Sequence, residues 1–239
     1  MKKYISITTL LAAGTLFAGA VEPVWSANAL EITTKSGSFT NADFGNKIGS
    51  AFTTSFVLDF ESVKTLLTTP TNTPFITVQG SGTAEYFGVA NNQKDFKFLN
   101  GTYGYYSLTG NPLGTNLVSA VNSGTYSEIA LTVTFDNTNG ASATVVLQNE
   151  DGSETKTLSG SVSSYKYSNF GNLASLVVNS RMVNYVSLYN TTMTAGSTDA
   201  VNAAKAAISA AIPEPSAFGL LAGLGALALV GARRRRKTK

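Results

Sequence analysis

Residues 128–148 read EIALTVTFDNTNGASATVVLQ, and they decide the fold. Four apolar side chains recur at every second position of the first half, which is the period of a strand with one buried face. They are Ile129, Leu131, Val133 and Phe135. A second apolar run follows at Ala143–Gln148, and Asn139-Gly140 stands between the two runs. This dipeptide accepts positive φ and favours a two-residue turn, so the segment predicts an antiparallel hairpin.

The same alternation extends outward on both sides of this hairpin. Asp151-Gly152 supplies a second turn signal, and a helical spacing of apolar residues predicts one short helix at Glu61–Thr68. Strand-like alternation is found near both ends of the body, in Phe52, Phe56, Leu58 and Phe60 and in Val183, Tyr185 and Tyr189. We therefore predict a meander of about ten to twelve short strands, folded as an antiparallel β-sandwich over residues 30–195.

Three segments, in chain order, resemble the concanavalin A-like, laminin G-type sandwich. Residues 52–60 are similar to that family's opening core strand, although the family's usual tryptophan is absent. Residues 128–152 resemble its central hairpin pair, and residues 183–194 resemble its closing strand. The resemblance implies an all-β, concanavalin A-like jelly roll. It carries no function over, because this fold hosts lectins, glycosidases and adhesive modules alike.

The N-terminal segment has the layout of a secretory signal peptide. Met1-Lys2-Lys3 is a basic start, and an apolar run follows from Ile5 to Ala20. Two small-residue cleavage motifs are present, Ala18-Gly19-Ala20 and Ala27-Asn28-Ala29. Because Glu22 and Pro23 look like a polar region before the cut, we expect cleavage after Ala27 or Ala29. The signal peptide is then residues 1–29, the mature chain begins near Leu30, and the lone tryptophan, Trp25, is removed.

The C-terminal segment, residues 213–239, has three parts. Pro213-Glu214-Pro215 is followed by the uncharged apolar run Ser216–Ala232 and then by Arg233, Arg234, Arg235, Arg236 and Lys237. As a helix, the 17-residue run is about 26 Å long, near the short limit for crossing a bilayer. It predicts a transmembrane helix whose basic end stays in the cytoplasm. The prolines cannot continue a helix, so the motif before the run is expected to be extended.

This three-part tail resembles the PEP-CTERM signal of exopolysaccharide-producing Gram-negative bacteria. The resemblance implies that a membrane-embedded exosortase recognises Pro213, Glu214 and Pro215 and cuts near them, with Arg233–Arg236 as the stop signal. It also implies export to the cell envelope, cell surface or extracellular matrix. An ordinary C-terminal membrane anchor is the alternative, which explains the apolar run and the arginines but not the motif.

Between the body and the tail, residues 196–212 are small and rich in alanine. Asp199 suits the start of a helix through Ala200–Ala211. We expect this segment to be a linker or stalk that holds the sandwich away from the membrane.

Composition excludes several classes of protein. The chain has 17 basic and 14 acidic residues, but the two terminal signals carry eight of the basic and two of the acidic ones. The nine basic and twelve acidic residues that remain give the body a charge near −3, which does not favour nucleic-acid binding. The absence of cysteine excludes a disulfide framework, and the absence of histidine excludes Ser-His-Asp catalysis and the usual zinc sites.

The carboxylates do not form a recognisable catalytic motif. Glycosidases need two carboxylates across a cleft, and glucanases of this fold use a Glu-x-Asp-x-Glu strand, which this chain lacks. The nearest cluster, residues 150–154, has the wrong spacing and is explained by its Asp151-Gly152 turn. We therefore predict a protein without catalytic residues, resident metal or cofactor.

Two features favour a glycan-binding surface as the alternative. Asp136–Gly140 holds the oxygen atoms that calcium prefers, although a solvated hairpin turn explains the segment as well. Tyr103, Tyr105 and Tyr106 lie on one strand, where neighbouring side chains point to opposite faces. At least one tyrosine is expected to face outward and stack on a sugar ring, unless core packing accounts for all three. The sequence thus predicts a non-catalytic surface or matrix protein associated with exopolysaccharide, with a lectin-like module as the alternative.

Overall fold

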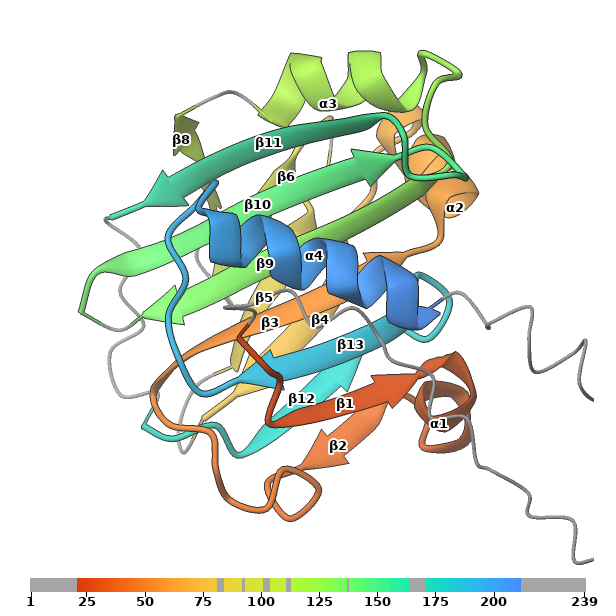
Figure 1. Ribbon diagram of the computed structural model, residues 1–239. Helices are drawn as coiled ribbons and strands as arrows, with labels where there is room; N and C mark the ends of the chain where they lie inside the picture. The colour runs from red at the N-terminus through yellow and green to blue at the C-terminus, as the bar shows by residue number, and fades with distance from the viewer. Residues whose placement is uncertain are drawn as a thin grey trace, which may run out of the picture.

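The protein folds as two antiparallel sheets packed face to face (Figure 1). The computed structural model describes residues 21–80, 84–91, 93–100, 104–110, 113–136, 138–163 and 171–211. The two sheets confirm the predicted all-β sandwich. The more specific likeness to the concanavalin A-like type stays a prediction.

One sheet has seven strands and the other has six. Every paired neighbour in both sheets is antiparallel, as the hairpin-rich sequence predicts. In spatial order, the seven-stranded sheet is β1 (Trp25–Asn28), β13 (Val183–Tyr189), β3 (Ala51–Leu58), β9 (Glu128–Asp136), β10 (Gly140–Gln148), β11 (Thr155–Val162) and β8 (Thr109–Gly110). The six-stranded sheet is β2 (Ser38–Thr40), β12 (Ser175–Val178), β4 (Thr73–Gln79), β5 (Ala84–Val89), β6 (Phe96–Asn100) and β7 (Gly104–Ser107).

The main hydrophobic core lies between the two sheets and is built largely from phenylalanine. Phe98 packs edge-to-face on Phe135 with ring centroids 5.6 Å apart, and Phe52 stacks on Phe135 at 5.3 Å. These rings come from strands of both sheets, so they join the two layers directly. The inward positions of β3 and β9 are those that the alternation predicted, because a strand places every second side chain on one face.

Both predicted hairpin turns are longer than expected. β9 ends at Asp136 and β10 begins at Gly140 itself, which pairs with Asp136, so the connection is longer than two residues. Gly140 has φ +94°, and a Cβ there would lie 2.1 Å from the Val162 carbonyl oxygen. The glycine therefore serves a close strand contact as well as the turn. The second turn runs over residues 149–154, with Gly152 at φ +73°.

A bulge in β13 breaks the alternation that the sequence predicted for Val183, Tyr185 and Tyr189. The pairing with β3 shifts register between Val183 and Tyr185. Val183 consequently faces the core between the sheets, whereas Tyr185 and Tyr189 lie on the opposite face of the sheet. A bulge adds one residue to one strand and so exchanges the faces of the residues beyond it.

Four helices accompany the sheets within the described residues. They are α1 (Ala29–Thr34), α2 (Phe60–Thr68), α3 (Leu113–Val121) and α4 (Thr198–Ala211). α2 confirms the short helix expected at Glu61–Thr68, and its N-cap is Asp59, whose side chain accepts a hydrogen bond from the Ser62 amide.

The structure differs from the sequence prediction at both ends of the body. The helix expected through Ala200–Ala211 is confirmed as α4, but it does not form the expected stalk at residues 196–212, because it lies across the outer face of the seven-stranded sheet (Figure 1). Alanine side chains are small enough to let this helix approach the sheet closely, which the prediction of a linker overlooked. At the other end, Trp25–Asn28 lies inside the segment expected to be the signal peptide, yet it forms the edge strand β1.

Candidate functional surfaces

The outer face of the seven-stranded sheet binds the C-terminal segment through buried hydroxyl groups. We call these residues the hydroxyl stripe, and they are Thr53, Ser55, Thr132, Thr134, Thr144 and Ser187. Hydroxyls at this depth need hydrogen-bond partners, and several of them bond the backbone of residues 191–200. A polar outer face would be expected to meet water, but here it meets another segment of the same chain.

Three hydrogen bonds define this attachment most clearly. Thr132 Oγ1 donates to the Ala200 carbonyl at 2.8 Å, and Thr134 Oγ1 donates to the Met193 carbonyl at 2.8 Å. The Gly196 amide donates to Thr144 Oγ1, also at 2.8 Å. The sequence does contain a sign of this buried outer face, because the outward positions in the middle of β3, β9 and β10 carry threonine and serine in place of charged residues. Sequence reasoning missed it because the partners are backbone atoms about 50 to 70 residues further along the chain.

Beyond the hydroxyl stripe, α4 is held by apolar contacts. Ala204, Ala207 and Ile208 are almost fully buried against the sheet. Their partners on the outer face are Val57, Ala130, Val146 and Tyr185. The helix ends at Ala211, and Pro213 follows after one further residue. The predicted sorting motif therefore begins directly after a docked helix.

The predicted tyrosine surface lies at a sheet edge. β7 is the last strand of the six-stranded sheet, and its backbone pairs Tyr105 with Leu99 and Tyr106 with Phe98. Tyr103 lies outside the described residues. An edge strand leaves one side of its backbone without a strand partner, which suits peptide or glycan contact. The role of these tyrosines as a ligand surface stays a prediction.

The Asp136–Gly140 loop uses its carboxylate for its own turn. Asp136 Oδ1 accepts hydrogen bonds from the Thr138 amide at 2.8 Å and the Asn139 amide at 3.1 Å. The Asn139 side chain donates to Oδ2 at 2.8 Å. Partial burial raises the pKa of Asp136, but these hydrogen bonds outweigh it and the net pKa is lowered. This arrangement is a solvated turn, and no group of three metal-binding side chains occurs within the part of the chain that the structure describes.

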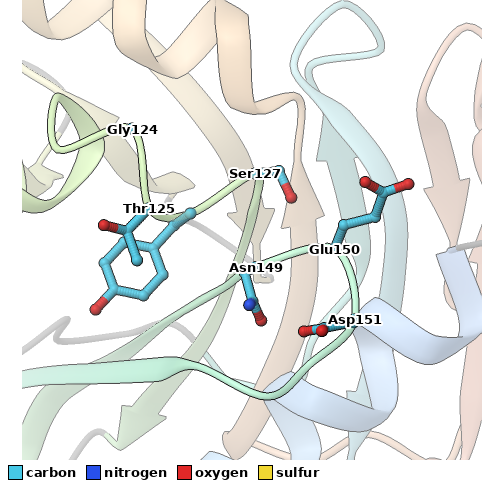
Figure 2. A pocket seen from close by; sticks show the side chains of 7 residues that line it. Gly124, Thr125, Ser127, Asn149, Glu150 and Asp151 are labelled. Atoms are coloured by element: carbon cyan, nitrogen blue, oxygen red, sulfur yellow. The ribbon is translucent and has the colours of Figure 1, made fainter.

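An open hollow of about 560 Å³ lies beside the turn between β10 and β11. Figure 2 shows Asn149, Glu150 and Asp151 on this turn and Thr125 on the facing loop, with the Glu150 side chain pointing away from Thr125. Asn149 Oδ1 accepts from the Glu154 amide at 3.0 Å, and Asp151 Oδ1 accepts from the Ser153 amide at 2.9 Å. Asn149 and Asp151 therefore stabilise the turn itself, as the sequence indicated for residues 150–154.

Glu128 is a half-buried acid at the same end of the seven-stranded sheet. Burial raises the pKa of Glu128, and the negative charges of Glu150 and Asp59 raise it further. Glu128 therefore retains its proton to a higher pH than an ordinary glutamate. Asp59 also serves as the N-cap of α2, through the hydrogen bond that its side chain accepts from the Ser62 amide.

The predicted sorting residues lie beyond the last described residue, Ala211. They are Pro213, Glu214, Pro215, Arg233, Arg234, Arg235 and Arg236, together with the expected membrane helix at 216–232. Residues 1–20 of the expected signal peptide also lie outside the described part of the chain. Among the described residues, no helix combines the length and apolarity required to span a membrane.

A comparison with models of protein families identifies the C-terminal tail. Residues 211–236 match the family model of the PEP-CTERM protein-sorting motif. The match confirms the resemblance, and it indicates an exosortase-sorted surface or extracellular protein. None of the curated proteins matches the chain. The matched residues cover only the tail, so the role of the sandwich has to be argued from its own surfaces.

Proposed function

We propose, from the PEP-CTERM motif at residues 211–236, that this protein is a non-catalytic component of the cell surface or extracellular matrix of a Gram-negative bacterium. A signal peptide starts export, and the helix at 216–232 holds the precursor in the membrane with Arg233–Arg236 on the cytoplasmic side. An exosortase then cuts near Pro213–Pro215 and releases or transfers the body.

The observation that carries this proposal is the match of residues 211–236 to the sorting motif, and the docked helix α4 leads directly into that motif. α4 packs on the sheet as far as its last residue, Ala211, and the motif starts two residues later, at Pro213. In this proposal, the short connection keeps the folded body close to the membrane until cleavage at the motif changes its location, and none of the described strands and helices is lost. The docking of α4 also supports a compact product with its C-terminus on the surface.

We further propose that the delivered body associates with extracellular polysaccharide. The position of Tyr105 and Tyr106 on the edge strand β7 favours this idea, because an aromatic side chain there can stack on a sugar ring. A lectin-like module with a defined sugar site is the second candidate. Calcium is less favoured as a cofactor, since the Asp136 carboxylate already accepts three hydrogen bonds from its own loop.

Glu214→Ala in the native host tests the sorting proposal. We expect the variant to retain its C-terminal tail and to stay in the membrane fraction, whereas the wild-type body loses the tail. The intact mass and the fractionation of the product measure both effects. Glu154→Ala is the matched control, because Glu154 is an exposed turn residue of the body. A variant whose C-terminus and location equalled those of the wild type would overturn sorting through this motif.

The polysaccharide proposal is tested with the secreted body and the host's own exopolysaccharide. We expect saturable binding that the double variant Tyr105→Ala/Tyr106→Ala weakens at least about tenfold, or about 1.4 kcal/mol. Circular dichroism checks that the variant remains folded. Binding that a calcium chelator abolishes would favour the lectin-like module instead. A folded wild-type body that bound no polysaccharide would contradict both ideas and leave a purely structural role.

A further inference from the structure

Residues on the N-terminal side of the expected signal-peptide cut belong to the folded sheet. β1 pairs antiparallel with β13, from Trp25 opposite Leu188 to Asn28 opposite Tyr185. The Val24 amide extends this pairing, since it donates to the Leu188 carbonyl at 2.8 Å. β1 thereby covers the edge of the seven-stranded sheet. Without it, the backbone groups of β13 on that side would lack strand partners.

The side chain of Trp25 closes one end of the core. Its ring lies 4.8 Å from the ring of Phe39 and 4.9 Å from that of Phe44, centroid to centroid, in two edge-to-face contacts. Phe39 and Phe44 are almost completely buried, and Ala27 on the same strand is 2% exposed. A chain that began after Ala27 or Ala29 would lose these contacts and expose apolar surface.

The residues around the expected cut also begin α1. Asn28 is the N-cap of this helix, and its Oδ1 accepts hydrogen bonds from the Leu30 amide at 3.2 Å and the Glu31 amide at 3.3 Å. The helix places Ile32 in the core at 0% exposure. A cut after Ala29 would remove the cap together with the strand, at the start of a helix of only six residues.

We propose that the signal peptide ends at Ala20 and that the mature protein begins at Val21. This inference rests on the export that the proposed function assumes. In the motif Ala18-Gly19-Ala20, Ala20 stands directly before this bond and Ala18 stands three residues before it, and these are the two positions at which a cleavage site requires small residues. Val21 and Val24 are exposed, so the new terminus lies at the surface and leaves β1 complete. The mature protein then keeps Trp25, the single tryptophan of the chain.

Expression of the full chain in the native host, followed by purification of the exported product, tests the inference. N-terminal sequencing and intact mass are expected to give Val21 as the first residue. Tryptophan fluorescence is an independent readout, because a product that begins at Asn28 or Leu30 contains no tryptophan. Either of those starts, with the fluorescence lost, would overturn the inference and leave export intact. A chain that kept Met1 and stayed inside the cell would instead overturn export itself.

Two matched variants sharpen the test. Ala20→Gln places a large polar residue directly before the proposed cut, and we expect loss of the product that begins at Val21. Ala29→Gln changes the downstream motif at an exposed position, and we expect an unchanged product. The reverse result, with processing sensitive to Ala29→Gln and insensitive to Ala20→Gln, would refute cleavage at Ala20.

Discussion

Ile208→Ala tests whether α4 is part of the fold or a detachable stalk. Ile208 is 1% exposed and lies in the apolar contact between α4 and the outer face of the seven-stranded sheet. Its neighbours there include Val57, Val146 and Tyr185, which stand on paired strands. Strands that are paired on both sides cannot move far to fill the space that a shorter side chain leaves.

The magnitude follows from the burial of the side chain. Replacing a buried isoleucine by alanine costs about 2–5 kcal/mol, through lost transfer energy and the cavity that remains. The contact lies under a single helix that can shift toward the sheet, so we expect the lower part of this range, about 2–3 kcal/mol. For a body of this size, that loss corresponds to a decrease of roughly 5–10 °C in the melting temperature.

Chemical denaturation of the purified body, residues 21–211, measures the free energy of unfolding for the wild type and the variant. Ser209→Ala is the control, because Ser209 is exposed on the adjacent position and its hydroxyl bonds only the Lys205 carbonyl of the same helix. We expect this control to change stability by less than about 0.5 kcal/mol. An Ile208→Ala variant as stable as the control would refute the docking of α4.

Three further predictions concern the sheets and their loops. Gly140→Ala should destabilise the body by at least about 2 kcal/mol in a thermal melt, because the new Cβ would meet backbone atoms. Gly124→Ala is the control: a Cβ there would have nothing within 4 Å, so this variant should cost only the strain of a positive φ, about 1 kcal/mol. Thr134→Val should cost about 1–3 kcal/mol by the same measurement, since it leaves buried backbone groups unpaired; an unchanged melting temperature would contradict the role of the hydroxyl stripe. The hydrogen bond from Lys35, with others from Thr40, lowers the pKa of Asp43 to about 2. This stabilisation is complete above about pH 4 and is lost as the pH falls toward 2, so melting temperatures measured against pH should fall less steeply for Asp43→Asn over that interval, and equal slopes would contradict the linkage.

Local pattern was sufficient for the sheets and their inward faces. The alternation around Ile129 and Phe135 predicted strands whose apolar side chains enter the core, and the helical spacing near Leu66 predicted α2. These features depend on neighbours in sequence, since a strand or helix repeats its own geometry from residue to residue. The position of the Asn139-Gly140 turn was predicted correctly, but its length was not. Gly140 is the first residue of β10, where the Val162 carbonyl of the next strand leaves no room for a Cβ, and this contact is distant in the chain.

The candidate sites divide in the same way. The sorting tail is a linear motif that an enzyme reads along the chain, so its residues could be recognised in sequence and the family match confirms the tail as a whole. The hydroxyl stripe could not be recognised, because Thr132 and Thr134 are ordinary strand residues until their partners Ala200 and Met193 are placed above them.

The sequence by itself determined the fold class, the position of the sorting tail and the absence of cysteine and histidine chemistry. Only the tertiary structure showed that two further segments pack on the body. Trp25–Asn28 looked like part of a signal peptide and Thr198–Ala211 like a stalk, yet both pack on the seven-stranded sheet. The physical reason is that a short strand or an alanine-rich helix has little stability alone, and its place is set by surfaces distant in the chain that it buries.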